Sequence, residues 1–155
     1  MIKLRRILAA SDFSECSDHA LRYACEFAET FGAELHIVNV TEPPAAAYSE
    51  FGIGYVGVDK LNEDFQRGAE AKLNTVPSPE WQDKLKIVRR AILGSAFVEL
   101  IQYAKKEGID LIVMGTHGRG AIAHMLMGST AEKVVRKAPC PVLTVRPEGH
   151  EFVMP

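Results

Sequence analysis

Residues 109–130 read IDLIVMGTHGRGAIAHMLMGST, and this stretch decides the fold. The short, nearly continuous apolar run Asp110–Met114 is typical of a strand buried on both faces of a parallel sheet. A glycine-rich loop follows, and Ser129 and Thr130 then open an amphipathic helix. A strand, a glycine loop and a helix in this order predict one unit of a parallel α/β sheet.

Outward from this unit, the chain alternates between strand and helix patterns. We expect strands over Leu4–Ala10, Leu35–Val40, Leu85–Ile92, Asp110–Met114 and Val142–Val145, and helices over Glu15–Phe31, Asp59–Asn74, from Gly94-Ser95 to Lys106, and Ser129–Ala138. Thr41–Val58 reads as a long loop, and Phe31 and Val135 fall on the inward faces of their helices. Strands separated by helices imply right-handed crossovers and helices on both faces of the sheet.

Charge predicts the strand order. The third strand carries Lys84, Lys86, Arg89 and Arg90, which a strand buried on both faces would not tolerate. This places it at a sheet edge, which favours the order 3-2-1-4-5 over the alternative doubly wound order 2-1-3-4-5. The predicted fold is α/β, a doubly wound, Rossmann-like open sheet of five parallel strands. Its ligand site should lie where strands 1 and 4 end, at Ala10–Ser14 and Gly115–Thr130.

Composition narrows the function. The chain has 155 residues, 47% hydrophobic and 25% charged, with a net charge of -2, which suits one globular domain over residues 1–147 and a tail over 148–155. No basic stripe indicates nucleic-acid binding, and no apolar run is long enough for a membrane span or a signal peptide. Three cysteines without CxxC spacing fit a reduced cytoplasm and argue against a disulfide framework or a zinc module.

The glycine loop has the chemistry of an anion site. Its glycines let backbone N–H groups approach a ligand, and Gly128-Ser129-Thr130 stands at a helix N-terminus, where the dipole favours phosphate. Arg119 and the two hydroxyls add donors. An alternative is that Ser129–Glu132 forms a capping box, in which the serine caps its own helix.

These residues carry a family resemblance. Gly115-x2-Gly118-x9-Gly128-Ser129 resembles the nucleotide-binding signature of the universal stress protein family, and residues 131–146 resemble its last helix and strand. Residues 109–115 and 11–15 resemble its fourth strand and the turn after its first, so the resemblance covers residues 3–146. It implies a cytoplasmic, usually dimeric ATP-binding stress protein with an adenine nucleotide alpha hydrolase-like fold. Ala10, where proline is frequent, and Gly120-Ala121 depart from the common pattern.

The resemblance also implies particular contacts. Asp12 would contact the nucleoside, the backbone of Val40 the adenine, and the signature glycines the phosphates and ribose, while Ser11 keeps the hydroxyl of a threonine common in ATP binders. The expected set is Ser11, Asp12, Val40, Gly115, Thr116, His117, Gly118, Arg119, Gly128, Ser129 and Thr130. The expected ligand is ATP, with AMP or ADP as alternatives and Mg²⁺ bridging the phosphates. Val142–Val145 would pair antiparallel with a second copy.

Other motifs give no competing site. Gly52–Gly57 is a literal GxGxxG, but a loop precedes it rather than a strand, so we interpret it as loop, and no Walker sequence occurs. His117 and His124 lack the cysteine or carboxylate partners of a zinc site, and no residue is assigned to catalysis. Three hypotheses remain open: an ATP-binding stress-response regulator, a slow ATPase or phosphotransferase at the same site, and an interaction module with a vestigial pocket.

Overall fold

The computed structural model describes residues 1–42, 55–117 and 127–147, so the predicted tail 148–155 lies outside the described residues. The elements in chain order are β1 (Arg6–Ala10), α1 (Glu15–Phe31), β2 (Glu34–Thr41), α3 (Tyr55–Leu73), α4 (Pro79–Gln82), β3 (Ile87–Leu93), α5 (Ala96–Glu107), β4 (Leu111–Gly115), α6 (Ser129–Lys137) and β5 (Val142–Val145). No described helix is long and apolar enough to cross a membrane.

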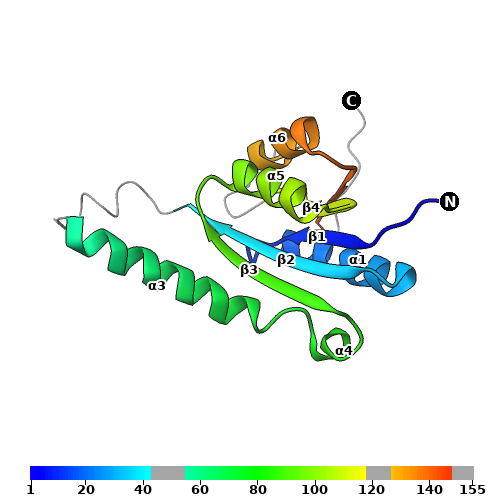
Figure 1. Ribbon diagram of the computed structural model, residues 1–155, viewed down its shortest axis with the longest axis horizontal. Helices are drawn as coiled ribbons and strands as arrows, with labels where there is room; N and C mark the ends of the chain where they lie inside the picture. Colours follow the sequence, from blue (N-terminus) through cyan, green and yellow to red (C-terminus); the bar gives the residue numbers. More distant parts are fainter. Residues whose placement is uncertain (43–54, 118–126, 148–155) are drawn as a thin grey trace.

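Across the described residues, five parallel strands form one sheet in the order β3-β2-β1-β4-β5 (Figure 1). The predicted order is therefore confirmed, with β3 at an edge. The charged side chain of Arg89 on β3 forms hydrogen bonds with backbone carbonyls near the end of α3. Its Nε donates to the carbonyls of Leu73 and Val76, at 2.9 and 3.1 Å. The guanidinium thereby binds the carbonyl of Leu73, the last residue of α3, and that of Val76 in the turn that follows.

Helices cover both faces of the sheet. Residues of α1 and α3 pack on one face with Ile37 of β2, and residues of α5 and α6 pack on the other with Val38 (Figure 1). Because successive side chains of a strand point to opposite faces, a strand between two helical layers is apolar at nearly every position. This is why the central strands read as continuous apolar runs.

The region before β3 differs from the prediction. α3 begins at Tyr55 rather than Asp59, so the last residues of the Gly52–Gly57 motif open a helix, and the loop assignment was wrong for residues 55–58. Val58 is half-buried and continues, one turn upstream, the apolar spacing that runs through Leu61. The short helix α4 was not predicted either.

Two apolar side chains do not lie inward as predicted. Phe31 is 44% exposed and Val135 is 47% exposed. Phe31 is the last residue of α1, where Gly32 turns the chain away in the left-handed conformation, and its ring contacts Phe27 instead. On α6, Ala131 and Val134 already fill the buried row, and Val135 lies about 100° further around the helix.

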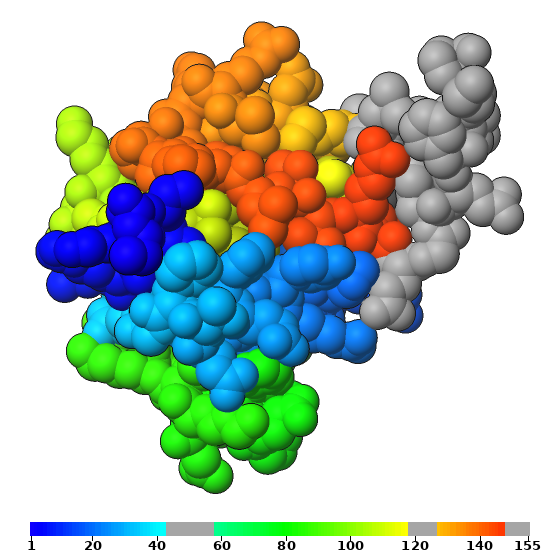
Figure 2. All heavy atoms as spheres, turned by 90° about the vertical axis from the view of Figure 1, so that its right-hand side faces the viewer, coloured from blue at the N-terminus to red at the C-terminus, as the bar shows by residue number. Residues whose placement is uncertain are grey.

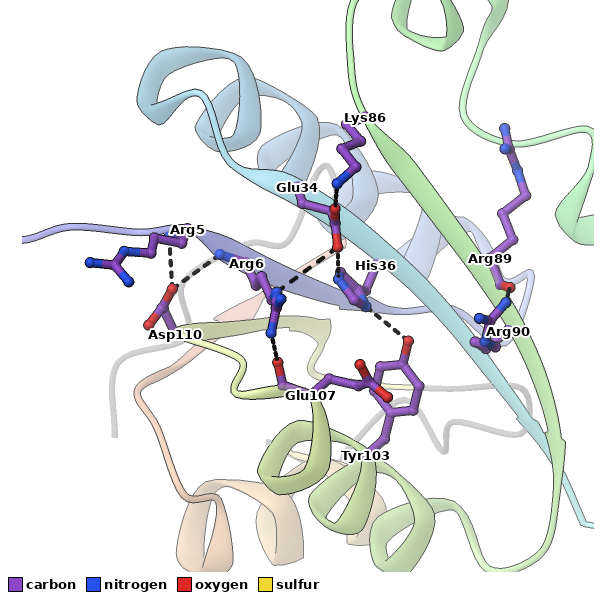
Figure 3. A network of polar contacts seen from close by, with 10 residues as sticks. All are labelled: Arg5, Arg6, Glu34, His36, Lys86, Arg89, Arg90, Tyr103, Glu107 and Asp110. Atoms are coloured by element: carbon purple, nitrogen blue, oxygen red, sulfur yellow. Dashed lines mark hydrogen bonds and ion pairs between the residues drawn. The ribbon is translucent and has the colours of Figure 1, made fainter.

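A polar network joins the elements at the amino ends of the strands (Figure 3). His36 of β2 is buried, and its Nδ1 and Nε2 lie 2.8 Å from the Tyr103 hydroxyl of α5 and from the Glu34 carboxylate. Glu34 also pairs with Lys86 and, at 3.9 Å, with Arg6. The hydrogen bond from Lys86 lowers the pKa of Glu34, and His36 acts in the same direction. The network therefore ties β2 to β1, to the residue that precedes β3, and to α5.

Figure 2 shows this amino edge, where the N-terminal segment (dark blue), the turn between α1 and β2 (blue) and the segment between α4 and β3 (green) adjoin. A groove of about 450 Å³ lies here, lined in part by Arg5, Glu29, Glu34, Lys84 and Lys86. Lys84 and Lys86 pair with Glu29 and Glu34, respectively. The groove stands at the end of the sheet opposite the predicted ligand site.

Candidate functional site

The candidate site is the carboxyl end of β1 and β4 together with the loops that leave these strands, named below the switch-point edge. The two strands pair in parallel, with Ala9 opposite Val113. α1 follows β1 on one face and α6 follows β4 on the other, so the loops diverge at this edge (Figure 1). Of the residues considered for this edge, Gly118, Arg119 and His124 lie outside the described residues.

The loop between β1 and α1 is held by its own side chains. Oδ1 of Asp12 accepts hydrogen bonds from the backbone N and the Oγ of Ser14, at 3.1 and 2.5 Å. Ser14 is the N-cap of α1 and accepts from the backbone N of Ser17 at 3.2 Å. Phe13 has a φ of 62°, and its N donates to Oγ of Ser11 at 3.2 Å. These bonds place the Asp12 carboxylate at the start of α1.

The start of α1 is an acidic pole. Burial raises the pKa of Asp18, the carboxylates of Asp12 and Glu15 raise it further, and only the guanidinium of Arg22 opposes them. A raised carboxyl pKa is what nearby negative charge produces. This side of the switch-point edge therefore suits hydroxyl donors or a cation better than a bare phosphate.

Gly115 ends β4 against the first turn of α1. A Cβ on Gly115 would lie 2.7 Å from Sγ of Cys16 and 3.1 Å from the Cys16 backbone C and O atoms. The Cys16 thiol is buried and donates to the carbonyl of Val145 at 3.5 Å. Helix–strand packing therefore requires a glycine at this position, whatever the ligand. Sequence reasoning assigned Gly115 to ligand contact and missed Cys16, because the contact joins residues far apart in the chain.

The two ends of the glycine loop are joined. The backbone N of Gly128 donates to the carbonyl of Thr116 at 2.6 Å, and a Cβ on Gly128 would lie 3.1 Å from that oxygen. The N of Thr116 donates to Val145 at 2.9 Å, and its hydroxyl lies 2.9 Å from Nδ1 of His117. Because Thr116 is itself buried, these bonds anchor the start of α6 to the end of β4.

The start of α6 corrects the capping-box alternative. The N-cap is Gly128 and Ser129 is already the first helical residue, so Ser129 does not cap its own helix. Glu132 pairs instead with Arg136, at 2.9 Å. Within the described residues no side chain caps this helix. The first N–H groups and the positive dipole end of a helix favour an anion, in contrast to the acidic pole at α1.

The end of β2 contributes a residue that the sequence did not single out. Val40, the expected adenine contact, is half-buried and packs with residues of the α5 and α6 layer. Beside it, Asn39 is buried, and its Nδ2 donates to the carbonyl of Ser11 at 2.8 Å. A polar residue inside the apolar run Ile37–Val40 was the available signal.

The fold and the switch-point edge define a Rossmann-like, doubly wound α/β protein. The chain belongs to the universal stress protein family, whose model matches residues 3–146. The resemblance seen in the sequence is confirmed. Universal stress protein MJ0577 of Methanocaldococcus jannaschii is 28% identical over 94% of this chain and 96% of its own length. The solved structure of MJ0577 matches with a TM-score of 0.83, at 25% identity, over 96% of this chain and 100% of that one.

Two further solved structures contain nucleotides. A universal stress protein in complex with cAMP matches with a TM-score of 0.67, at 23% identity, over 95% of this chain and 100% of that one. A universal stress protein from Archaeoglobus fulgidus in complex with dAMP matches with a TM-score of 0.58, at 17% identity, over 94% and 99%. At these identities the likeness shows a shared fold alone.

Proposed function

We propose that this protein binds an adenine nucleotide at the switch-point edge and acts as a cytoplasmic stress-response regulator. The observation that carries the proposal is the start of α6, which no described side chain caps and which lies opposite an acidic pole. A nucleotide has matching poles, with ribose hydroxyls for a carboxylate and phosphates for N–H groups. Universal stress proteins that share this fold have been solved with cAMP and with dAMP, so adenine nucleotides are the ligands to test first.

Each expected residue has a role in this proposal. Asp12 accepts hydrogen bonds from the ribose, the backbone of Val40 contacts adenine, and Ser11 and His117 border the site. Gly128, Ser129 and Thr130 present the start of α6 to the phosphates, with Gly115 and Thr116 at the end of β4 and Gly118 and Arg119 completing the loop. ATP is the expected nucleotide, and Mg²⁺ bound to it would offset phosphate charge near the acidic pole.

Calorimetric titration tests nucleotide binding. ATP, ADP, AMP and cAMP are titrated separately, with and without Mg²⁺, into the wild-type chain and into Asp12→Asn. The asparagine keeps an oxygen that can accept from Ser14 but removes the charge. We expect about tenfold weaker binding for this variant, and no change for Asp59→Asn on the exposed surface of α3. Absence of heat for all four nucleotides at millimolar concentration would overturn the proposal.

The same preparation separates a regulator from an enzyme. A regulator retains bound ATP, whereas a slow ATPase or phosphotransferase releases ADP. We expect no ADP above the buffer control over several hours of incubation with saturating ATP and Mg²⁺. ADP release that the Asp12→Asn variant loses would assign hydrolysis to the site instead.

We also propose that the edge of β5 that no other described strand covers, named below the outer edge, pairs with a second copy of the chain. The carbonyls of Pro141 and Val145 accept hydrogen bonds from the backbone of Ile112 and Thr116, so these two residues of the β5 segment direct their polar groups toward β4. Successive residues of a strand direct their backbone polar groups to opposite sides. The N–H of Thr144 therefore points to the outer edge. Thr144→Pro removes this one donor and leaves the β4 ladder intact. Light scattering should show a wild-type dimer and a folded monomeric variant. A monomeric wild type would contradict the pairing.

A further inference from the structure

Asn39 is a buried polar side chain to which the proposed function assigns no contact with the nucleotide. It lies on β2, near the middle of the sheet, and is 4% exposed. Burial of an amide is costly unless both of its ends are hydrogen-bonded. Nδ2 of Asn39 donates to the carbonyl of Ser11 at 2.8 Å, and Oδ1 accepts from the hydroxyl of Thr41 at 3.0 Å. The amide therefore joins the end of β2 to the loop that follows β1.

The orientation of this amide follows from its partners. The Ser11 carbonyl can only accept, so the NH₂ group of Asn39 must face it, and Oδ1 then faces Thr41. The Thr41 hydroxyl is consequently the donor that holds Oδ1. Without this donor, the amide oxygen would lose its partner and the NH₂ group would be less firmly aimed at Ser11.

The loop that the amide holds is conformationally unusual. Phe13 adopts a left-handed φ of 62°, which is rare for a bulky residue that is not glycine. Such conformations persist only where the surroundings enforce them. Ser11 is tied to β2 on both sides of its peptide unit, since its N donates to the carbonyl of Val38 at 3.0 Å and its carbonyl accepts from Asn39. These bonds fix the peptide immediately before Asp12.

We propose that Asn39, oriented by Thr41, is a positioning residue of the nucleotide site. It holds the loop Ser11–Ser14 in the conformation that presents the Asp12 carboxylate, without touching the ligand itself. The inference rests on the proposed function, because Asp12 must contact the nucleotide for its placement to matter. The two hydrogen bonds of the Asn39 amide, to Ser11 and from Thr41, are called the clamp below. Loss of the clamp lowers the fraction of molecules whose Ser11–Ser14 loop is in the binding conformation, and the apparent affinity for the nucleotide falls in proportion to that fraction.

The test uses threonine variants of matched chemistry. Thr41→Val removes the hydroxyl but keeps the shape, and Thr41→Ser keeps the hydroxyl. Thr75→Val removes the hydroxyl of a threonine just beyond the end of α3, which donates to the carbonyl of Lys72 at 2.7 Å. ATP affinity is measured by calorimetry, stability by urea unfolding, and the amide resonances of Asp12 and Phe13 by nitrogen-edited NMR without nucleotide.

For Thr41→Val we expect the ATP Kd to rise about tenfold, as a competent fraction near one tenth would require, and the two loop resonances to shift. Thr41→Ser should restore both, and Thr75→Val should change neither, even if it loses stability. A purely structural role for the clamp predicts lower stability with an unchanged Kd, and that result would overturn the inference. If the Asp12 and Phe13 resonances of Thr41→Val, measured without nucleotide, are the same as those of the wild type, the inference is also overturned. Absence of ATP binding by the wild type would instead remove the proposed function, whatever the loop resonances show.

Discussion

Replacement of Gly115 by alanine tests why this signature position is glycine. The added Cβ would lie 2.7 Å from Sγ of Cys16 and 3.1 Å from two backbone atoms of that residue. The sulfur can be removed by mutation, but the backbone atoms belong to the first turn of α1 and move only with the helix. Overpacking of this kind costs about 1–3 kcal/mol. We expect a loss near 2 kcal/mol, or roughly 4–8 °C in Tm for a domain of this size.

A double-mutant cycle separates the two contacts. Cys16→Ala should cost about 1 kcal/mol alone, because it removes a buried sulfur. In the double variant, Cys16→Ala removes the sulfur that the new Cβ of Gly115→Ala would meet at 2.7 Å. The double variant should therefore lose at least about 1 kcal/mol less stability than the two single variants lose in sum. Urea unfolding measures all four proteins. Gly68→Ala in α3 is the control, since its Cβ meets nothing within 4 Å, and alanine there should stabilise by about 0.5–1 kcal/mol. Additive losses, or a Gly115→Ala variant as stable as wild type, would refute the packing explanation.

Three further predictions concern titratable groups. Tyr103→Phe should lower the free energy of unfolding by about 1–2 kcal/mol, because buried His36 loses the hydroxyl 2.8 Å from its Nδ1; an unchanged urea midpoint would contradict this. Because the pKa of Glu34 is lower in the folded protein than its ordinary value of 4.5, the ionised carboxylate stabilises the fold fully at pH values above 4.5. This stabilisation is lost as the pH falls through the lowered pKa. The difference in stability between wild type and Lys86→Gln should therefore narrow toward zero on acidification, and a difference independent of pH would count against the pair. Burial raises the pKa of Cys25 to about 12, so iodoacetamide at pH 8.5 should label it only after unfolding; rapid labelling of the native protein, followed by mass spectrometry, would show otherwise.

Local patterns were sufficient for most of the architecture. The helix Glu15–Phe31 and the strand Val142–Val145 have the predicted bounds, because periodicity and terminal glycine or proline are properties of neighbouring residues. The cations of the third strand even predicted its edge position, since only an edge lets such side chains reach water or a helix end. The start of α3 was missed because the preceding sequence Gly52-Ile53-Gly54 contains none of the Ser, Thr, Asp or Asn residues that usually signal a helix start.

The sequence by itself determined the α/β class, the five strands and their order, and four of the helices apart from the start of α3. Only the tertiary structure decided why Gly115 must be glycine, that Gly128 rather than Ser129 is the N-cap of α6, and what holds the loop before Asp12. The first set follows from side-chain periodicity and charge along a short stretch. The second depends on atoms of Cys16 and Asn39 that reach the switch-point edge only after the sheet has formed, and no local pattern carries that information.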